Sequence, residues 1–436
     1  MIESTRTALD AAFAQNAASE RLPAAAAALV RDGRIVWTGA HRADPSTQFR
    51  IGSITKTLVA VAVLQLRDEG ALALSDPIGR HLPELPFPFT ITQLLTHTSG
   101  LSAESAGSWW ERSPGASWAT LAAGLELVHE PGTRFHYSNT GYGVLGELVA
   151  RLRGTDWLTV VRERILEPLG MDRTSAMPES PFAEGLAVHP TEHLVLSEPT
   201  PDAGAMAPAG QLWCSVEDLA AWAAFVAQGD DRVLATSTLR EMQVPLAVDD
   251  RLDLPWATAQ GLGFRVWNDG RHGQRRFAGH GGSMPGFIAV LKVDLESGDG
   301  VVAMGSSTHQ FGPIADTLLE TWWAADPPAA SDAPEVLPDV EPLLGSWFWG
   351  PREFVLEAHA DGFILGDSPE GRRSRFVRDG DRWRGLDGYF AGERLHLRDD
   401  GAIELATFVL ARSPYDPAVR HPGGAGLWRP APTGGE

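Results

Sequence analysis

Hydrophobic and polar positions along the first 330 residues predict strands at both ends of a long helical stretch. Two apolar runs, 24–30 and 34–40, are separated by Asp32-Gly33 and predict a β-hairpin. From about residue 70 to residue 230 the spacing is mostly helical, and strand-like runs return between 262 and 306. Strands at both ends of a helical insertion indicate an antiparallel sheet flanked by helices, and therefore an α+β fold rather than a doubly wound parallel one. The expected helices are 5–18, 53–66, 140–152, 157–165, 216–227 and 312–325, and the expected later strands are 262–267, 276–279, 286–294 and 300–306.

The chain changes character after residue 326. Residues 326–342 hold five prolines among Ala, Ser, Asp and Glu, a composition typical of a linker. Residues 343–412 alternate short strand-like runs with Asp-Gly turns, which predicts a small antiparallel up-and-down β-barrel. We therefore expect a main unit at 1–326, a linker at 327–342, a barrel at 343–412 and a Pro/Gly-rich tail at 413–436.

Composition and charge narrow the classes of partner. Apolar runs such as 24–30 and 58–64 have seven residues, whereas a membrane-spanning helix needs about 20, so we expect no membrane partner. A net charge of −20 argues against nucleic acid and anionic membranes. The single Cys214 excludes an intramolecular disulfide and a multi-cysteine site, and we expect no metal or cofactor. The first thirty residues hold several charged side chains and no apolar signal core, which favours a cytoplasmic location.

Lysine is scarce, and one of the two lysines stands in a reactive pattern. The 36 basic residues are 34 arginines plus Lys56 and Lys292. Arginine does not lose its proton in a protein, whereas a buried lysine can. Lys56 follows Ser53 at i+3 at the start of a predicted helix, so that the hydroxyl and the amine share one face. A serine beside a desolvated lysine is an activated nucleophile, and the alternative is a serine-capped helix with an exposed lysine.

Two further motifs follow along the chain. Tyr137-Ser138-Asn139 precedes a predicted helix, where a phenol near a lysine can handle protons and Asn139 can bind a substrate amide. The alternative is an ordinary helix cap. Gly279-His280-Gly281-Gly282-Ser283 ends a short predicted strand, where glycines let a substrate backbone approach. The alternative for that segment is a turn between strands.

In this order and spacing, the three motifs resemble those of the serine β-lactamase and penicillin-binding-protein-like family. The resemblance is to the branch with Tyr in the second motif and His in the third, which includes class C β-lactamases, D-Ala-D-Ala peptidases, D-aminopeptidases and related esterases. Residues 94–101 and 209–215 also look like this family, and we interpret both as scaffold, with His97 as a structural histidine. The resemblance covers about residues 5–326.

The resemblance implies a role for each matching residue. Ser53 is the expected nucleophile, and Lys56 and Tyr137 share proton transfer, with the choice of base left open. Asn139 and His280 are expected to orient the substrate. The remaining expected site residues are the backbone N–H groups of Ser53 and Ser283 as oxyanion hole, and Gly281, Gly282 and Arg429 for substrate binding. Because β-lactam-hydrolysing members commonly have Lys in place of His280, efficient β-lactam hydrolysis is less favoured.

The two-part layout directs the functional hypothesis. The C-terminal part resembles the lipocalin-like domain of some family members, and the whole is similar to penicillin-binding-protein-type thioesterases. The favoured function is therefore release and macrocyclisation of a nonribosomal peptide, with a D-configured acyl residue, from the thioester of a carrier protein. Arg429 either folds back with the tail toward the active site or is an ordinary solvated side chain. Trp109, Trp110 and Trp118 line a peptide groove or belong to the core.

Other functions stay open on the sequence. The main alternative is a cytoplasmic esterase, D-aminopeptidase or amidase acting on a small ester or amide. A β-lactamase or D-Ala-D-Ala carboxypeptidase is less favoured. A non-enzymatic binding protein on the same fold is weaker still, because all three motifs are intact.

Overall fold

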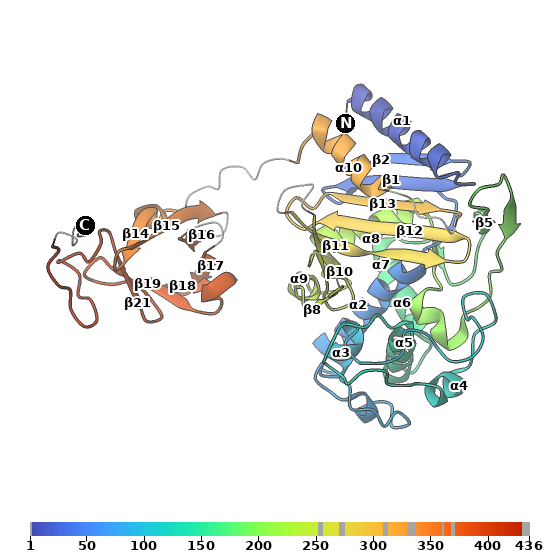
Figure 1. Cartoon of the computed structure of the whole chain (residues 1–436), viewed down its shortest axis with the longest axis horizontal. Coiled ribbons are helices and arrows are strands. Elements are labelled where there is room, and N and C mark those ends of the chain that lie inside the picture. The colour runs from blue at the N-terminus through green and yellow to red at the C-terminus, as the bar shows by residue number, and fades with distance from the viewer. Residues whose placement is uncertain are drawn as a thin grey trace, which may run out of the picture. The chain divides into compact units, whose positions relative to one another are not determined.

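The first unit is built on an eight-stranded antiparallel sheet with strand order β2-β1-β13-β12-β11-β10-β9-β8 (Figure 1). Two strands come from the start of the chain and six from the end of the unit, and the β1–β13 pair joins the two groups. The predicted α+β fold is therefore confirmed. The strands are β1 (Ala25–Arg31), β2 (Arg34–His41), β8 (Ala247–Val248), β9 (Thr258–Gln260), β10 (Arg265–Asp269), β11 (Arg275–Met284), β12 (Phe287–Asp294) and β13 (Gly300–Gly305).

This computed structural model describes residues 2–251, 256–269, 275–307, 313–328, 337–359, 362–367 and 371–429. The chain divides into two compact units, Met1–Pro328 and Ala329–Glu436. Residues 329–336 of the expected linker lie outside the described residues. Within the described residues, no helix is both long and apolar enough to span a bilayer.

Helices cover both faces of the sheet, which explains why β1 is an unbroken apolar run. Side chains of a strand alternate between its two faces. The odd-numbered residues 25–29 pack with α1 (Glu3–Ser19) and α10 (Ile314–Ala325). The even-numbered residues 26–30 pack with α2 (Thr55–Asp68) and α8 (Val216–Gln228). A strand buried on both faces has no polar alternation.

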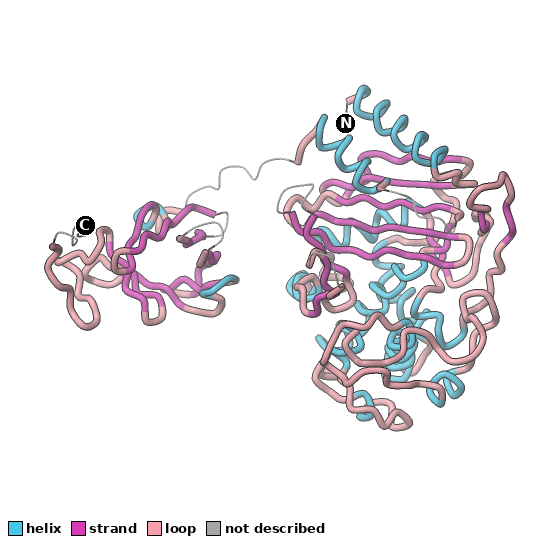
Figure 2. The backbone as a smooth tube through the Cα atoms, in the orientation of Figure 1, coloured by secondary structure: helices cyan, strands magenta, loops and turns pink. Residues whose placement is uncertain are grey.

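The insertion between β2 and β8 is less helical than predicted. Between α2 and residue 138 the described backbone forms only short helices joined by irregular segments, so that part of the expectation is wrong (Figure 2). Helices of five or six residues cannot show a helical period clearly. The longer helices are where the pattern placed them. The remaining helices are α3 (Ile91–Leu95), α4 (Trp118–Ala123), α5 (Asn139–Arg153), α6 (Trp157–Val161), α7 (Glu167–Leu169) and α9 (Thr236–Met242), with a π-helical turn at Arg162–Leu166 and single 3₁₀ turns at Gly52–Ile54, Ile78–Arg80 and Gly204–Ala209.

Two small sheets lie outside the main one. A three-stranded sheet places β7 (Trp213–Cys214) between β3 (Phe49–Arg50) and β4 (Thr174–Ser175). A separate hairpin pairs β5 (Leu186–Val188) with β6 (Val195–Ser197). The first of these is relevant to function, because β3 ends three residues before Ser53 and anchors the chain there.

The glycine-rich motif around His280 belongs to the interior of a strand. The sequence predicts a strand that ends at Gly279, but β11 continues to Met284 and pairs with β12 throughout residues 277–284. Glycine normally weakens a strand. Here a close backbone contact explains why glycine is present. A Cβ on Gly282 would come within 1.9 Å of the Ile51 carbonyl oxygen.

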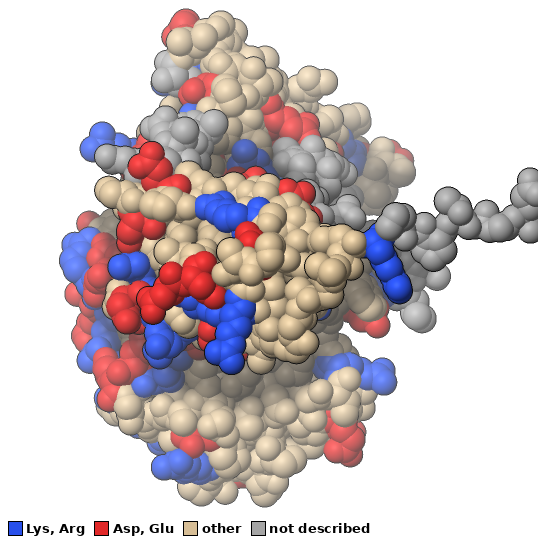
Figure 3. Space-filling view, turned by 90° about the vertical axis from the view of Figure 1, so that its left-hand side faces the viewer, with Lys and Arg blue, Asp and Glu red and all other residues tan. Residues whose placement is uncertain are grey.

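The second unit is a closed eight-stranded antiparallel barrel, as predicted. Its interior is filled by aromatic and aliphatic side chains, among them Trp347, Phe363 and Trp383. On the face shown in Figure 3, acidic and basic side chains lie intermixed. The strands are β14 (Gly345–Trp349), β15 (Arg352–His359), β16 (Gly362–Gly366), β17 (Arg373–Asp379), β18 (Arg382–Gly385), β19 (Arg394–Leu397), β20 (Ile403–Leu405) and β21 (Phe408–Ala411), with 3₁₀ turns at Glu341–Leu343 and Gly388–Phe390.

Candidate active site

Ser53 lies on a tight turn between β3 and α2. Gly52 has φ +53°, and a Cβ at this position would lie 2.5 Å from the backbone nitrogen of Ser283. Glycine is therefore required for the turn to approach β11. The arrangement brings the backbone of Ser53 beside that of Ser283, where the sequence predicts the oxyanion hole.

Lys56 is fully buried beneath Ser53. As an ammonium group its Nζ donates hydrogen bonds to Ser53 Oγ at 2.8 Å and to the Ala209 carbonyl oxygen at 2.6 Å. Residues 55–66 of α2 are all buried, so the apolar run after Lys56 removes water from the amine. Burial lowers the pKa of Lys56 from 10.5 to about 7, although the carboxylates of Glu104 and Glu111 favour the charged form.

Tyr137 completes a group of three polar side chains. It lines the same cavity as Ser53, and Lys56 Nζ lies 5.1 Å from the centre of its ring. Burial raises the pKa of Tyr137 well above its usual value, and the contact with Ser53 only partly offsets this. The phenol is therefore protonated at neutral pH, whereas about half of Lys56 is neutral at pH 7.

His97 holds the Tyr137 segment from two sides. Its carbonyl accepts a hydrogen bond from the His136 N–H at 2.7 Å, and its Nδ1 accepts one from the Ser138 N–H at 3.0 Å. Its ring lies 4.2 Å from the ring of Tyr137, centre to centre. His97 adopts φ +56°, a strained conformation for a non-glycine residue. The sequence favours His97 as a structural rather than a catalytic histidine and gives no sign of this contact with Tyr137.

His280 is buried and electrically neutral. Because a carbonyl only accepts hydrogen bonds, its Nδ1–H donates to the Gly281 carbonyl oxygen at 2.6 Å. Its Nε2 is buried and has no partner among the described residues. Burial and the nearby Lys56 lower the pKa of His280 to about 3. Its ring centre lies 6.1 Å from that of Tyr137.

The motif on β11 lies at a strand edge next to Ser53. β10 pairs with β11 only as far as Arg265 and Gly279, so among the described residues no strand pairs with this edge of β11 at 280–284. A substrate backbone can lie along such an edge and form ladder hydrogen bonds. Nothing in the described structure lies within 4 Å of the position of a Cβ on Gly281.

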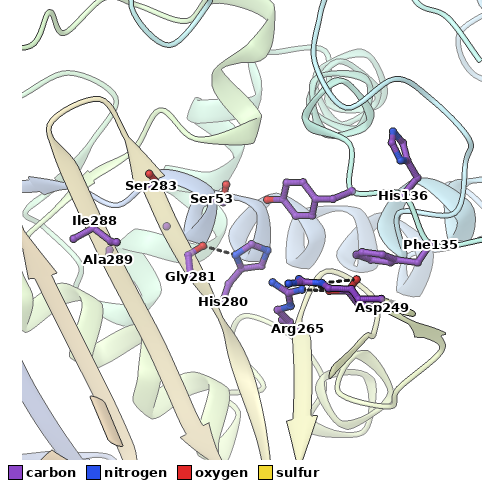
Figure 4. A pocket seen from close by; sticks show the side chains of 13 residues that line it. Ser53, Phe135, His136, Asp249, Arg265, His280, Gly281, Ser283, Ile288 and Ala289 are labelled. Atoms are coloured by element: carbon purple, nitrogen blue, oxygen red, sulfur yellow. Dashed lines mark hydrogen bonds and ion pairs between the residues drawn. The ribbon is translucent and has the colours of Figure 1, made fainter. Parts of the chain in front are cut away.

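A cavity of about 600 Å³ brings most of the predicted residues together (Figure 4). Six of them line it: Ser53, Tyr137, His280, Gly281, Gly282 and Ser283. Sequence reasoning missed its remaining lining residues, which are Phe135, His136, Asp249, Arg251, Arg265, Ile288 and Ala289. Phe135 and His136 adjoin Tyr137 in sequence, which is a usable signal. The sequence gives no comparable signal for Arg251 and Arg265, because nearly every basic residue of the chain is an arginine.

Three predicted residues are not among those that line the cavity, and the first of them, Lys56, lies beneath Ser53. Asn139 is set back, where its Nδ2 donates to Glu104 at 2.7 Å and its buried Oδ1 has no partner among the described residues. Arg429 belongs to the second unit and is exposed.

The three tryptophans do not line the cavity. Trp110 is buried and donates to Glu104, and Trp118 donates to Glu84. Trp109 is 58% exposed. Within the described ranges, no three potential metal ligands come together.

The antiparallel sheet and its helical insertion, with a serine, a lysine and a tyrosine in contact at their junction, define a class of serine hydrolases. A family model described as Beta-lactamase matches residues 9–320, and the chain belongs to this family of serine hydrolases. The resemblance expected from the motifs is thereby confirmed. A second family model, described as a domain of unknown function (DUF7586), matches residues 336–412 and covers the barrel.

Individual relatives extend the comparison. The Protein flp of Staphylococcus aureus (strain MRSA252) is 24% identical over 325 residues, which are 69% of this chain and 62% of flp. The chain thus spans less than two thirds of that relative. A D-stereospecific amidohydrolase from Streptomyces sp. is 26% identical with a TM-score of 0.59, over 72% of this chain and 96% of that one.

Two solved structures extend over both units and share the fold. The octameric penicillin-binding protein homologue from Pyrococcus abyssi has a TM-score of 0.64 at 21% identity, over 92% of this chain and 98% of its own. SurE has a TM-score of 0.58 at 24% identity, over 94% and 99% respectively.

Proposed function

We propose that this protein is a serine acyl-enzyme hydrolase that acts on esters or amides. The observation that carries the proposal is the 2.8 Å contact between Ser53 Oγ and the buried Lys56 amine, whose pKa lies near 7. A neutral lysine at this distance can accept the serine proton as the hydroxyl attacks a carbonyl. The geometry favours Lys56 over Tyr137 as the base, because the Tyr137 phenol keeps its proton.

Each step of the reaction has a proposed group. Ser53 Oγ forms a bond to the substrate carbonyl carbon while its proton moves to Lys56 Nζ. The N–H groups of Ser53 and Ser283 bind the resulting oxyanion. The leaving group departs with a proton delivered from Lys56 through Tyr137, and water then hydrolyses the ester on Ser53. His280 orients the substrate, with Gly281 and Gly282 giving it the β11 edge, and Asn139 lies behind this wall, bonded to Glu104.

We propose an acyl residue of D configuration. The support is the likeness to the D-stereospecific amidohydrolase, which extends over 96% of that chain. The family resemblance of the motifs points the same way.

The test is covalent labelling of Ser53. A neutral fluorophosphonate should add mass to the peptide that contains Ser53, and Ser53→Ala should lose both the label and turnover. Ser283→Ala is the matched control, because it keeps the backbone N–H. Paired D- and L-amino acid amides then test the stereochemistry, and equal rates for the two would refute the D preference.

A second candidate is release and macrocyclisation of a nonribosomal peptide from a carrier-protein thioester. It is favoured by the barrel that follows the first unit, a layout similar to that of penicillin-binding-protein-type thioesterases. Hydrolase and cyclase share all the residues above and differ in whether water or an amine reaches the acyl-enzyme. Peptidyl thioesters that carry a free amine, with products read by mass spectrometry, separate the two. Cyclic product from the D-configured substrate alone would favour release and cyclisation.

A further inference from the structure

One end of the barrel in the second unit gathers aromatic side chains at its surface. The connections β14–β15, β16–β17, β18–β19 and β20–β21 meet at this end, because successive strands of the closed barrel are antiparallel. An aromatic group of Trp349, Tyr389 and Phe408 lies at three of these connections. The ring centre of Phe408 is 4.7 Å from that of Trp349 and 6.3 Å from that of Tyr389. Tyr389 is 59% and Trp349 38% exposed, so this aromatic group opens onto solvent.

Arg372 belongs to the β16–β17 connection and reaches into the aromatic group. Its guanidinium carbon lies 4.3 Å from the ring centre of Tyr389, 5.4 Å from that of Trp349 and 5.5 Å from that of Phe408. A cation within about 6 Å of a ring centre is attracted by the negative face of that ring. Three rings therefore hold one guanidinium, and they fix its position without the help of a carboxylate.

The Arg372 guanidinium lacks a counter-charge in the described part of the chain. Its Nη1 is buried, and no described residue accepts a hydrogen bond from it. The neighbouring carboxylate of Asp367 accepts the backbone N–H of Arg372 at 2.7 Å and forms an ion pair with the side chain of Arg352. The charge of Asp367 is therefore already matched. A guanidinium left in this state can still form the charge-assisted hydrogen bonds that an anion offers.

Two other arginines of the barrel stack on tryptophan rings and show the difference. Arg378 lies 5.0 Å from the ring centre of Trp383 and forms an ion pair with Asp339 at 3.1 Å. Arg412 lies 3.8 Å from the centre of a second tryptophan ring and donates to three backbone carbonyls. In both cases an acceptor accompanies the stacking. At Arg372 the described residues supply only the rings, so we expect the acceptor to come from a ligand.

The chemistry of that ligand follows from what the aromatic group leaves unmatched. An organic cation is disfavoured, because Arg372 already occupies the ring faces. A neutral apolar ligand would cover the exposed rings but leave the guanidinium without an acceptor. An aromatic carboxylate uses both features, because its two oxygens match parallel N–H donors and its ring can stack on Tyr389 or Trp349.

We propose that Arg372 and the aromatic group around it form a binding site for a small organic acid whose carboxylate is attached to an aromatic ring. The site lies within the second unit and shares no residue with the Ser53 cavity. It gives the barrel a ligand-binding role that does not depend on the proposed acyl-enzyme chemistry. Binding is non-covalent and leaves the ligand unchanged.

The experiment compares 2-naphthoate with 2-naphthamide, which share a ring system and differ in charge. Binding of each to the full-length protein is measured by isothermal titration calorimetry at low and high salt. The wild type should bind 2-naphthoate at least about tenfold more tightly than 2-naphthamide, which is the effect of one charge-assisted hydrogen bond. Added salt should reduce this difference.

In Arg372→Gln the Kd for 2-naphthoate should rise about 10- to 100-fold, while the Kd for 2-naphthamide stays the same. Arg372→Lys should give an intermediate Kd for 2-naphthoate, because it keeps the charge without the planar fork. Tyr389→Ala should weaken the binding of both ligands, because both stack on that ring. Arg378→Gln is the matched control, since Arg378 is also stacked but has an acidic partner, and this variant should bind both ligands as the wild type does.

The proposal is overturned if the wild type does not bind 2-naphthoate, or binds the two ligands equally. An unchanged Kd for 2-naphthoate in Arg372→Gln overturns it as well, and if that variant does not fold, an unchanged Kd in Arg372→Lys does so. Loss of 2-naphthoate binding in Arg265→Gln, with normal binding in Arg372→Gln, would place the anion in the Ser53 cavity and refute the site on the barrel.

Discussion

Replacing Lys56 with arginine keeps a positive charge beside Ser53 but removes a feature that arginine lacks, a neutral form near pH 7. Lowering the lysine pKa from 10.5 to about 7 raises the neutral fraction at pH 7 from roughly 0.03% to about one half. This gain of about a thousandfold is what the burial of Lys56 supplies to the reaction. An arginine in the same place would supply none of it.

The assay is the rate constant for acylation of Ser53, followed with an activated ester between pH 5 and pH 9. The wild-type rate should rise about tenfold for each pH unit below 7 and level off above it, because only the neutral amine accepts the serine proton. Lys56→Arg should lose this limb and be about 10²- to 10⁴-fold slower at pH 8, close to Lys56→Ala.

Lys292 is the matched control for this experiment. It is also buried but forms an ion pair with Asp316, so a charge suffices there. Lys292→Arg should keep the wild-type rate per folded enzyme. The base assignment is refuted if Lys56→Arg acylates at the wild-type rate, or if the limb near pH 7 persists in that variant.

The same contacts predict the outcome of two other changes to the chain, and the second candidate function predicts that of a third. Lys56→Met should raise the free energy of unfolding at pH 7 by up to about 4 kcal/mol, because the folded protein holds this proton less tightly than the unfolded chain. Between pH 7 and 10.5 the unfolded chain binds more protons than the folded protein, so the stability of the wild type rises with pH. Denaturant titrations at pH 7 and at pH 10.5 should therefore show a smaller difference in free energy of unfolding between Lys56→Met and the wild type at the higher pH. His97→Asn should retain at least about tenfold more kcat than His97→Leu, with similar KM, because the amide oxygen can still accept from Ser138 N–H; equal kcat values would remove the positioning role. The second candidate function, release with cyclisation, predicts that Arg429→Ala, or truncation after Gly426, leaves acylation intact and shifts peptidyl thioesters from cyclic to hydrolysed product; unchanged product ratios would remove Arg429 from that hypothesis.

Elements whose residues repeat at the short spacing of a strand or a helix could be predicted from the sequence. The unbroken apolar run of β1 and the turn at Asp32-Gly33 identified the first hairpin, because both faces of that strand are buried. Spacing at i and i+3 likewise identified Ser53 and Lys56 as neighbours. In contrast, the run around His280 was assigned to the end of a strand. Local composition cannot show that the backbone of Ile51 packs against Gly282 and makes glycine the residue that a strand needs there.

The charged side chains of the cavity wall, Asp249, Arg251 and Arg265, could not be predicted from the sequence for a different reason. Arg265 and Asp249 meet because β8, β9 and β10 pair with one another as antiparallel strands. The register of such a pairing cannot be recognised in the local sequence of either strand. The same holds for Glu104, which comes from an irregular loop to bind Asn139. Such contacts depend on the completed fold and not on any period in the chain.

The helix that follows Ser53, α2, is both part of the hydrophobic core and the element that carries Lys56. A helix that is apolar on all sides belongs in a core, and residues 55–66 of α2 are buried throughout. Lys56 is the one residue of that run with a charged form, and its ammonium form is costly there. The fold does not relieve that cost with a direct carboxylate partner of the kind that Asp316 gives Lys292. The Lys56 amine instead contacts a hydroxyl and a carbonyl, neither of which requires it to be charged. A lysine placed in this way is poised to take up and release a proton at neutral pH, which the attack of Ser53 requires of it.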